Sequence, residues 1–306
     1  MYDLIIIGGG PAGIAAGVYA ARKKIKTLLI TERFGGQSLV AAEIQNWIGT
    51  KSISGLDLAK NLEDHLRAQK EIEIREGDAV SEVEKILEGF KVTAKSKKYF
   101  ETKTILVASG GRRRKLGIPS EKELDGKGIA YCSTCDAPLF DGKIVAVVGA
   151  GNAGLETVRD LCCYAKKTYL MVRSDKVRGD PALFEEIKKD PNVEILYWAE
   201  PKEFLGEKLV TGLKYLDKKD NKIKELKLDG VFIEIGSVPN VEFLGDLVEK
   251  TQYDKIVASY ETQQTSQEGI WAAGDVTNVI YAQNNIAAGD AIKAVLNIYD
   301  YLNKKK

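Results

Sequence analysis

The sequence predicts an α/β protein with two domains of βαβ type, one inserted into the other. Two glycine-rich turns lead to this fold class, one at residues 8–13 and one at residues 149–154. Each turn follows a short apolar run and precedes a stretch of helix-forming residues, which is the strand–turn–helix order of a Rossmann-like unit. A chain of 306 residues is long enough for about two domains of ordinary size.

The first turn lies in a complete βαβ context. Residues 3–7 form an apolar run typical of a buried parallel strand, residues 14–22 form an alanine-rich helical stretch, and residues 27–30 form a second strand. An isolated GxGxxG motif is weak, but this context strengthens it. A glycine turn that binds no ligand is the alternative.

Four residues of this unit have defined tasks in binding a dinucleotide. Gly8 allows the tight turn, Gly10 lets a pyrophosphate approach the backbone, and Gly13 lets the helix pack closely on the strand. Glu32 follows the second strand, where it can accept hydrogen bonds from a ribose. The first half of the chain therefore predicts a dinucleotide site.

The second half repeats the construction. Residues 143–148 form a strand, residues 155–164 a helix and residues 168–172 the next strand, on either side of the second turn. This strand ends at Arg173, with Arg178 close behind, so positive charge faces the place of a 2′-phosphate and favours NADPH over NADH. The arginines could instead belong to a solvated surface turn, and Gly154 in the turn is the more usual sign of NAD.

The arrangement of the remaining strands predicts a discontinuous first domain. Residues 112–119 and 235–240 form the two crossings between domains, residues 269–275 form a strand that ends in an acid, and residues 284–302 form a closing helix. We expect a flavin-type domain at residues 1–113 and 242–306, and an inserted nicotinamide-type domain at residues 114–241.

Composition excludes several classes of function. Lys plus Arg (45) nearly cancel Asp plus Glu (44), so a general affinity for nucleic acid or for acidic membranes is not expected. The chain enters an apolar strand at once without a basic leader, and no run approaches the roughly 20 apolar residues needed to cross a bilayer. Four cysteines are too few for a secreted disulfide scaffold. We expect a cytoplasmic protein.

A redox motif stands between the two glycine turns. Cys132 and Cys135 form a CxxC pair, and Asp136 follows directly. At the start of a helix such a pair can close a small disulfide ring, and the helix dipole favours the thiolate. Between a flavin site and a nicotinamide site, the pair predicts a flavin-dependent disulfide reductase. Asp136 could be a catalytic acid and base or only a helix-capping acid.

Other reactive side chains carry less weight. A zinc site would need ligands beyond the CxxC pair, and only Cys162, Cys163 and His65 remain, so we expect no metal. One of the adjacent cysteines is expected to face the core, and His65 to be exposed. The basic run at residues 112–115 could guide an acidic partner or form a solvated crossing loop.

Taken in order, these motifs closely resemble the low-molecular-weight thioredoxin reductases over essentially the whole chain. The motifs are GGGPAG, Gly35-Gly36-Gln37, Glu43 to Trp47, the CxxCD centre, GAGNAG and Ala272 to Val276. The resemblance implies FAD, NADPH, a homodimer and reduction of a small thioredoxin-like protein.

The resemblance also implies residue roles. Cys135 would face the flavin, Cys132 would attack the disulfide of the partner, and Asp136 would act as general acid and base. The cofactor-binding residues expected are Gly8, Gly10, Pro11, Ala12, Gly13, Glu32, Gly36, Gln37, Asn46, Val80, Asp275 and Gln283 for the flavin, and Gly149, Gly151, Asn152, Ala153, Arg173, Arg178 and Gly236 for the nicotinamide nucleotide.

The sequence departs from this pattern in three stretches. Where most members carry a His-Arg-Arg run, this chain has Val172-Arg173-Ser174, and residues 32–37 and 138–143 look more like the reductase portion of the F subunit of alkyl hydroperoxide reductase. The alternative function is therefore an NADH-dependent reductase of a peroxiredoxin system, acting through a glutaredoxin- or thioredoxin-like carrier. A flavoprotein that only senses nucleotides or redox state is a third possibility, against which the intact CxxC argues.

Overall fold

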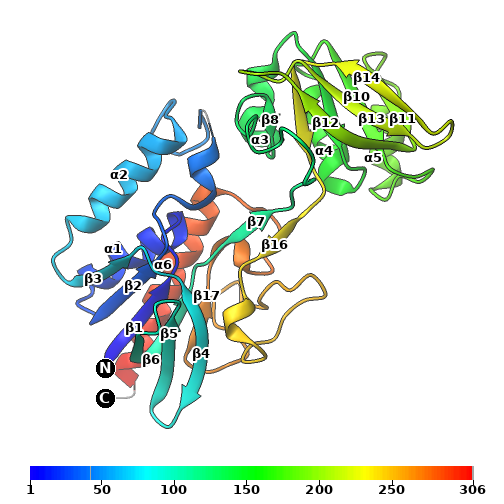
Figure 1. Ribbon diagram of the computed structural model, residues 1–306. Coiled ribbons are helices and arrows are strands. Elements are labelled where there is room, and N and C mark those ends of the chain that lie inside the picture. Colours follow the sequence, from blue (N-terminus) through cyan, green and yellow to red (C-terminus); the bar gives the residue numbers. More distant parts are fainter. Residues whose placement is uncertain (42, 305–306) are drawn as a thin grey trace. The chain divides into compact units, whose positions relative to one another are not determined.

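The computed structural model describes residues 1–41 and 43–304, and it has the α/β architecture with parallel sheets that the sequence predicts. The chain divides into two compact units (Figure 1). Unit 1 consists of Met1–Leu39, Ile44–Arg112 and Val238–Lys306, and unit 2 consists of Val40–Glu43 and Arg113–Ser237.

Unit 1 is a sheet flanked by helices. Its strands are β1 (Tyr2–Ile7), β2 (Thr27–Thr31), β3 (Ile72–Glu76), β4 (Val80–Ile86), β5 (Gly89–Ala94), β6 (Tyr99–Val107) and β17 (Ile270–Ala272). Its helices are α1 (Pro11–Arg22), α2 (Gly55–Arg67) and α6 (Asn284–Lys304), with short 3₁₀ turns η1 (Gly36–Val40), η3 (Glu242–Leu244) and η4 (Gly274–Val276). The sheet order is β3-β2-β1-β6-β5-β4, and β17 also pairs with β6. Strands β1, β2, β3, β6 and β17 pair in parallel, whereas β4 and β5 form an antiparallel extension.

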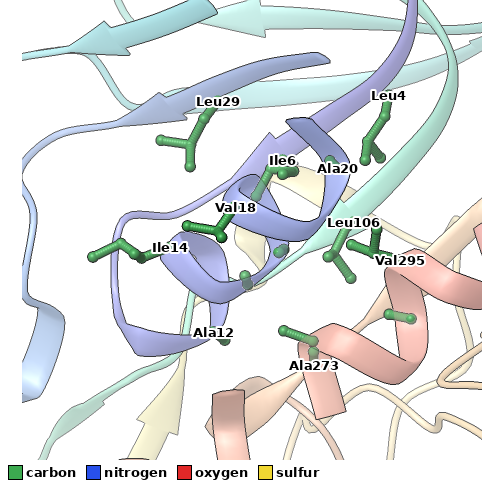
Figure 2. Close-up of a cluster of buried hydrophobic side chains, with 14 of the residues drawn as sticks. Leu4, Ile6, Ala12, Ile14, Val18, Ala20, Leu29, Leu106, Ala273 and Val295 are labelled. Atoms are coloured by element: carbon green, nitrogen blue, oxygen red, sulfur yellow. The ribbon is translucent and has the colours of Figure 1, made fainter. Parts of the chain in front are cut away.

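The core of unit 1 fills both faces of its sheet. On β1, Leu4 and Ile6 point into a cluster with α1 and α6, where Val18 and Val295 also lie (Figure 2). Ile5 points to the opposite face, into a second cluster. All of these side chains are buried. The continuous apolar run of β1 is therefore explained by burial on both faces, as parallel strands require.

Unit 2 is a parallel sheet with an antiparallel extension. Its strands are β8 (Ile129–Ala130), β9 (Ile144–Val148), β10 (Lys167–Val172), β11 (Val193–Tyr197), β12 (Ala199–Leu205), β13 (Gly212–Asp217), β14 (Lys222–Lys227) and β15 (Gly230–Ile233). Its helices are α3 (Ser133–Asp136), η2 (Ala137–Phe140), α4 (Asn152–Leu161) and α5 (Pro181–Ile187). The parallel sheet runs β11-β10-β9-β15-β8, and β12, β13 and β14 form a separate antiparallel sheet.

The two crossings pair with each other as a short ribbon. Strand β7 (Gly111–Arg113) and strand β16 (Ser237–Pro239) form a two-stranded sheet. Next to the ribbon, the N–H of Arg114 donates a hydrogen bond to the carbonyl oxygen of Gly236 at 3.0 Å.

The helices after the glycine turns begin earlier than the sequence predicts. We expected starts at residues 14 and 155, but α1 begins at Pro11 and α4 at Asn152, with Gly10 and Gly151 as their N-caps. The last three residues of each glycine turn already form the first helical turn. Periodicity cannot detect this start because these residues are small and lack an apolar stripe.

Each glycine turn depends on a contact of backbone against backbone. A Cβ on Gly13 would lie 1.9 Å from the carbonyl oxygen of Gly8, and a Cβ on Gly154 would lie 1.9 Å from that of Gly149. The first glycines have nearly the same left-handed conformation, with φ of +119° at Gly8 and +120° at Gly149. The helix can approach its strand this closely only without side chains at these positions.

We expect Gly154→Ala to destabilise the protein by about 1–3 kcal/mol, because a methyl group there must displace the backbone. Gly151→Ala is the matched control, since a Cβ there meets nothing within 4 Å and φ is −88°. Denaturant unfolding without added nucleotide measures both. Equal stability of the two variants would contradict the role of the close contact.

Candidate functional site

The middle glycine of each turn leaves room for a ligand. The nearest atom to a Cβ on Gly10 is the Cα of Gly36 at 3.9 Å, and a Cβ on Gly151 would meet nothing within 4 Å. Both N-caps are glycines, which have no side chain to cap the helix, and in α1 the N–H groups start at Ala12 because Pro11 has none. The first N–H groups of α1 and α4 are therefore available to an anionic group, as a pyrophosphate requires.

The two units place opposite charges at equivalent positions. The N–H of the first turn glycine donates to the carbonyl of Ile30 at 2.9 Å in unit 1 and to that of Met171 at 3.3 Å in unit 2. Two residues further on, unit 1 has Glu32 and unit 2 has Arg173, and both side chains are exposed. An acid suits a ribose with free hydroxyl groups, whereas an arginine suits a 2′-phosphate.

The loop of Arg178 folds against the second turn. The N–H groups of Arg178 and Gly179 both donate to the carbonyl oxygen of Ala150, at 2.8 and 3.0 Å. The side-chain oxygen of Asn152 accepts the N–H of Asp180 at 2.8 Å. Within the part of the chain that the structure describes, the ion pairs include neither Arg173 nor Arg178.

Several residues expected at the flavin come together in unit 1. The amide of Asn46 donates to the side-chain oxygen of Gln283 at 3.2 Å. Asp275 lies in η4, where a Cβ on the neighbouring Gly274 would be 3.5 Å from the Cβ of Ala12 in α1. The approach of Gly274 to Ala12 brings η4 to the start of α1, next to the glycine turn.

Other predicted residues lie near the same turn or in the core. Gly36 and Gln37 begin η1, and the Gln37 amide donates to the carbonyl of Gly111 at 3.0 Å. Val80 is buried in the second cluster of unit 1, so its side chain packs with the core and only its backbone is left for a ligand. Gly236 adopts φ of +99°, a conformation that favours glycine.

The CxxC pair forms a compact dithiol site in unit 2. Cys132 is the N-cap of α3, and its sulfur lies 2.6 Å from that of Cys135. A bonded pair is about 2.05 Å apart, so the two sulfurs are placed to form a disulfide. The hydroxyl of Ser133 donates to Asp160 of α4 at 2.7 Å and attaches the motif to that helix.

Neighbouring groups and burial dominate the electrostatics of the Cys132 thiol. The hydrogen bond with Cys135 and burial raise the pKa of the Cys132 thiol, and the charge of Asp136 adds to the rise. Helix α3 has only four residues, too few for a large dipole. The backbone N–H of Cys135 acts in the opposite direction and favours the thiolate, as expected at the start of a helix, but it does not offset the rise. A thiolate here needs a compensating proton or positive charge.

Asp136 has the properties of an acid that changes charge near neutral pH. Burial raises its pKa to about 6, while the nearby charge of Arg113 acts in the opposite direction. As the N-cap of η2, its side chain makes no capping hydrogen bond to the described residues, so a capping role explains little. An acid of this kind next to a dithiol can give and take a proton.

A second acid, Glu234, was missed by sequence reasoning. It directly follows β15 and is only 8% exposed. Burial raises its pKa to about 7, although Arg113 and the hydroxyl of Thr157 favour the charged form. The Thr157 hydroxyl lies 3.3 Å from its carboxylate. A charged residue inside the apolar run at residues 231–235 was the available signal.

Two basic residues of the crossing at residues 112–115 form ion pairs with acidic side chains. Arg112 pairs with Glu242 at 2.5 Å, and Lys115 pairs with Asp125 at 2.6 Å. Arg113 acts on the carboxyl groups described above. These pairs favour the structural interpretation of the run over a free basic patch.

The remaining reactive side chains stay apart from this site. Cys162 packs against the core, while Cys163 and His65 are exposed. No group of three or more potential metal ligands occurs among the described residues. Among the same residues, no helix is long and apolar enough to cross a membrane.

Two dinucleotide cradles together with a cysteine pair define an oxidoreductase that uses nucleotide cofactors. The chain belongs to the pyridine nucleotide-disulphide oxidoreductase family, whose model matches residues 2–291. This membership implies a flavin and a nicotinamide nucleotide, and the residues of the two cradles fit such groups.

Solved structures with the same fold include thioredoxin reductases. The enzyme from Streptococcus pyogenes matches with a TM-score of 0.92 at 30% identity, covering 99% of both chains. The thioredoxin reductase from Giardia duodenalis matches with a TM-score of 0.91 at 29% identity, again over 99% of both chains.

Curated relatives of similar sequence are longer. The F subunit of alkyl hydroperoxide reductase from Pseudomonas aeruginosa is 40% identical over 305 residues, and a protein named NADH dehydrogenase from Bacillus subtilis is 36% identical over 301 residues. Both matches cover 98% of this chain but 58% of the relative. The chain thus spans little more than half the length of these relatives.

We expect Glu234→Gln to stabilise the protein increasingly as the pH rises. Folding raises the pKa of Glu234 from 4.5 to about 7. The wild-type protein therefore has its full stability below about pH 4.5, where this acid is neutral in both the folded and the unfolded state. It loses stability as the pH rises through about 7, because the buried carboxyl group must then ionise. The difference in unfolding free energy between variant and wild type should grow by about 3 kcal/mol from about pH 4 to about pH 8. Glu186→Gln, at an exposed acid on α5, is the control. A pH-independent difference for Glu234→Gln would contradict the raised pKa.

Proposed function

We propose that the protein is a flavoprotein disulfide reductase that passes electrons from NADPH, through FAD and the Cys132–Cys135 dithiol, to the disulfide of a thioredoxin-like protein. The observation that carries this proposal is the dithiol itself: two sulfurs 2.6 Å apart, beside an acid whose pKa is about 6. The likeness to thioredoxin reductases over 99% of their chains supports it.

In this function, FAD in unit 1 would supply two-electron transfer between nicotinamide and disulfide. The residues proposed to hold it are those of the first turn, Glu32, Asn46 and Asp275. In the dithiol, Cys132 attacks the disulfide of the partner, and Asp136 donates and accepts the proton as general acid and base. A homodimer and the domain boundaries at residues 113 and 242 belong to the same proposal.

The donor assignment to NADPH is supported by the exchange of charge between equivalent positions. Glu32 in unit 1 and Arg173 in unit 2 follow the same hydrogen-bonded strand end. Arg178 adds a second positive charge on a loop that contacts the second turn. Two arginines outside the ion pairs of the described residues are suited to a dianionic phosphate.

A second candidate function has its own support in the curated relatives. They include the F subunit of alkyl hydroperoxide reductase at 40% identity, so the alternative is an NADH-dependent reductase of a peroxiredoxin system that works through a separate carrier. Steady-state rates with NADPH and NADH, and with thioredoxin and with peroxiredoxin plus carrier, separate the two candidates.

For the dithiol, we expect Cys132→Ser and Cys135→Ser each to abolish disulfide reductase turnover, because one sulfur cannot form or reduce the ring. Reduction of bound flavin by nicotinamide, followed by absorbance, should remain in both. The control is Cys163→Ser, at an exposed cysteine, which should keep normal turnover. Normal turnover of either motif variant would show that the motif is not the electron outlet.

For the donor, we expect the double variant R173A/R178A to raise the KM for NADPH far more than the KM for NADH. Each charge-assisted contact is worth about 1.5–3 kcal/mol, and loss of such uniform binding leaves kcat nearly unchanged. Lys176→Ala, on the same loop, controls for general loss of positive charge. If the wild type already uses both nucleotides equally, or if the double variant keeps its selectivity, the NADPH assignment fails.

A further inference from the structure

The dinucleotide cradle of unit 2 does not need the carboxyl group of Glu234. The two units correspond here as well: a Cβ on the first turn glycine would lie 2.3 Å from the carbonyl oxygen of Ala108 in unit 1 and of Glu234 in unit 2. The N–H groups of these residues donate to the preceding strand in the same way, at 2.9 and 2.8 Å. Because unit 1 builds its turn with an alanine, the turn of unit 2 does not require an acid.

Sheet register places Glu234 at the level of the redox motif. Strands β8 and β15 are parallel neighbours, with Phe232 paired to Ala130. Two residues beyond this pair, β15 leads to Glu234 and β8 leads to Cys132. Neighbouring strands lie about 4.8 Å apart, so the buried acid and the start of the CxxC motif follow the ends of two adjacent strands.

The charged groups around Glu234 connect it to Asp136. Arg113 of β7 acts on both carboxyl groups and favours their ionised forms. The charges of Asp136 and of Glu156 on α4 oppose the ionisation of Glu234. Two acids that share one positive charge and repel each other titrate as a pair, in two steps.

We propose that Glu234 and Asp136 hold one proton between them beside the dithiol, and that this proton neutralises a sulfur when the Cys132–Cys135 disulfide is reduced. Glu234 is in this role a positioning residue, which acts through Asp136. The inference rests on the proposed function only in taking the CxxC pair as the disulfide that is reduced.

The step balances as follows in protons and electrons. The disulfide accepts two electrons, the S–S bond breaks, and two thiolate sulfurs would result. One sulfur takes the proton of the carboxyl pair and becomes a thiol, which leaves a thiolate on the other sulfur and two carboxylates, whose ionised forms Arg113 favours. Solvent then returns a proton to the pair. Burial raises the pKa of Asp136 to about 6 and that of Glu234 to about 7, so these acids can hold a proton close to neutral pH.

The test follows reduction of the dithiol by a neutral trialkylphosphine, which needs no nicotinamide and no protein substrate. The phosphine supplies the electron pair and becomes its oxide with oxygen from water. The rate of appearance of thiols is measured against pH for the wild type, Glu234→Gln and Glu186→Gln. Rates are compared as ratios to Glu186→Gln, at an exposed acid on α5, so that titration of the phosphine itself cancels.

In the wild type the rate should fall as the last proton leaves the pair. In Glu234→Gln only Asp136 can hold the proton, so the midpoint should move down by about one pH unit. Glutamine can keep the contact with Thr157, so the variant should fold like the wild type. Superimposable profiles of Glu234→Gln and wild type overturn the proposal.

Failure of the proposed function gives a different result. If the wild type yields no more thiols than Cys135→Ser, the CxxC pair is not a reducible disulfide, and the electron outlet and the proton pair are both wrong. If thiols appear with the expected profiles while NADPH or thioredoxin proves inactive, the proton pair stands and the donor or partner assignment fails.

Discussion

Close approach of two backbones is the constraint on which both units depend. Each βαβ unit brings the first turn of its helix against the end of its strand, so that Gly13 faces the carbonyl of Gly8 and Gly154 faces that of Gly149. The contact fixes where the helix begins and leaves its first N–H groups without a side-chain cap from the described residues. The strand ends around each turn then set the positions of the neighbouring residues, which are Glu32 and Ala108 in unit 1 and Arg173 and Glu234 in unit 2.

The sequence contains strong local signals for this frame and weak ones for the charges around it. Apolar runs, glycine spacing and the CxxC pair are local, so the α/β class and the order of the strand–turn–helix units could be predicted. Helix starts were predicted late because small turn residues give no periodic signal. Local patterns cannot reveal the ion pairs of the crossing. Arg112 pairs with Glu242, which is distant in sequence, and the pair of Lys115 with Asp125 depends on the path of the chain at the crossing.

The candidate site shows the same division. The cysteines and Asp136 were found from spacing, but the raised pKa of Asp136 depends on burial and on Arg113, which only the fold supplies. Glu234 was missed because one acid in an apolar run resembles an ordinary strand end. The sequence indicated a helix at the motif but not that α3 has only four residues, so the balance between its N–H groups and the neighbouring thiol could be judged only from the fold.

The correspondence between the two units has a consequence for how cofactor chemistry can diverge. The packing contact involves glycine and main-chain carbonyl atoms, so it places no demand on the residues that face a ligand at the ends of the neighbouring strands. Glu32 and Arg173 are both exposed, and an exchange of charge there disturbs no core packing. A duplicated unit of this kind can thus change which nucleotide it selects, or acquire a buried acid such as Glu234, while the scaffold stays constant.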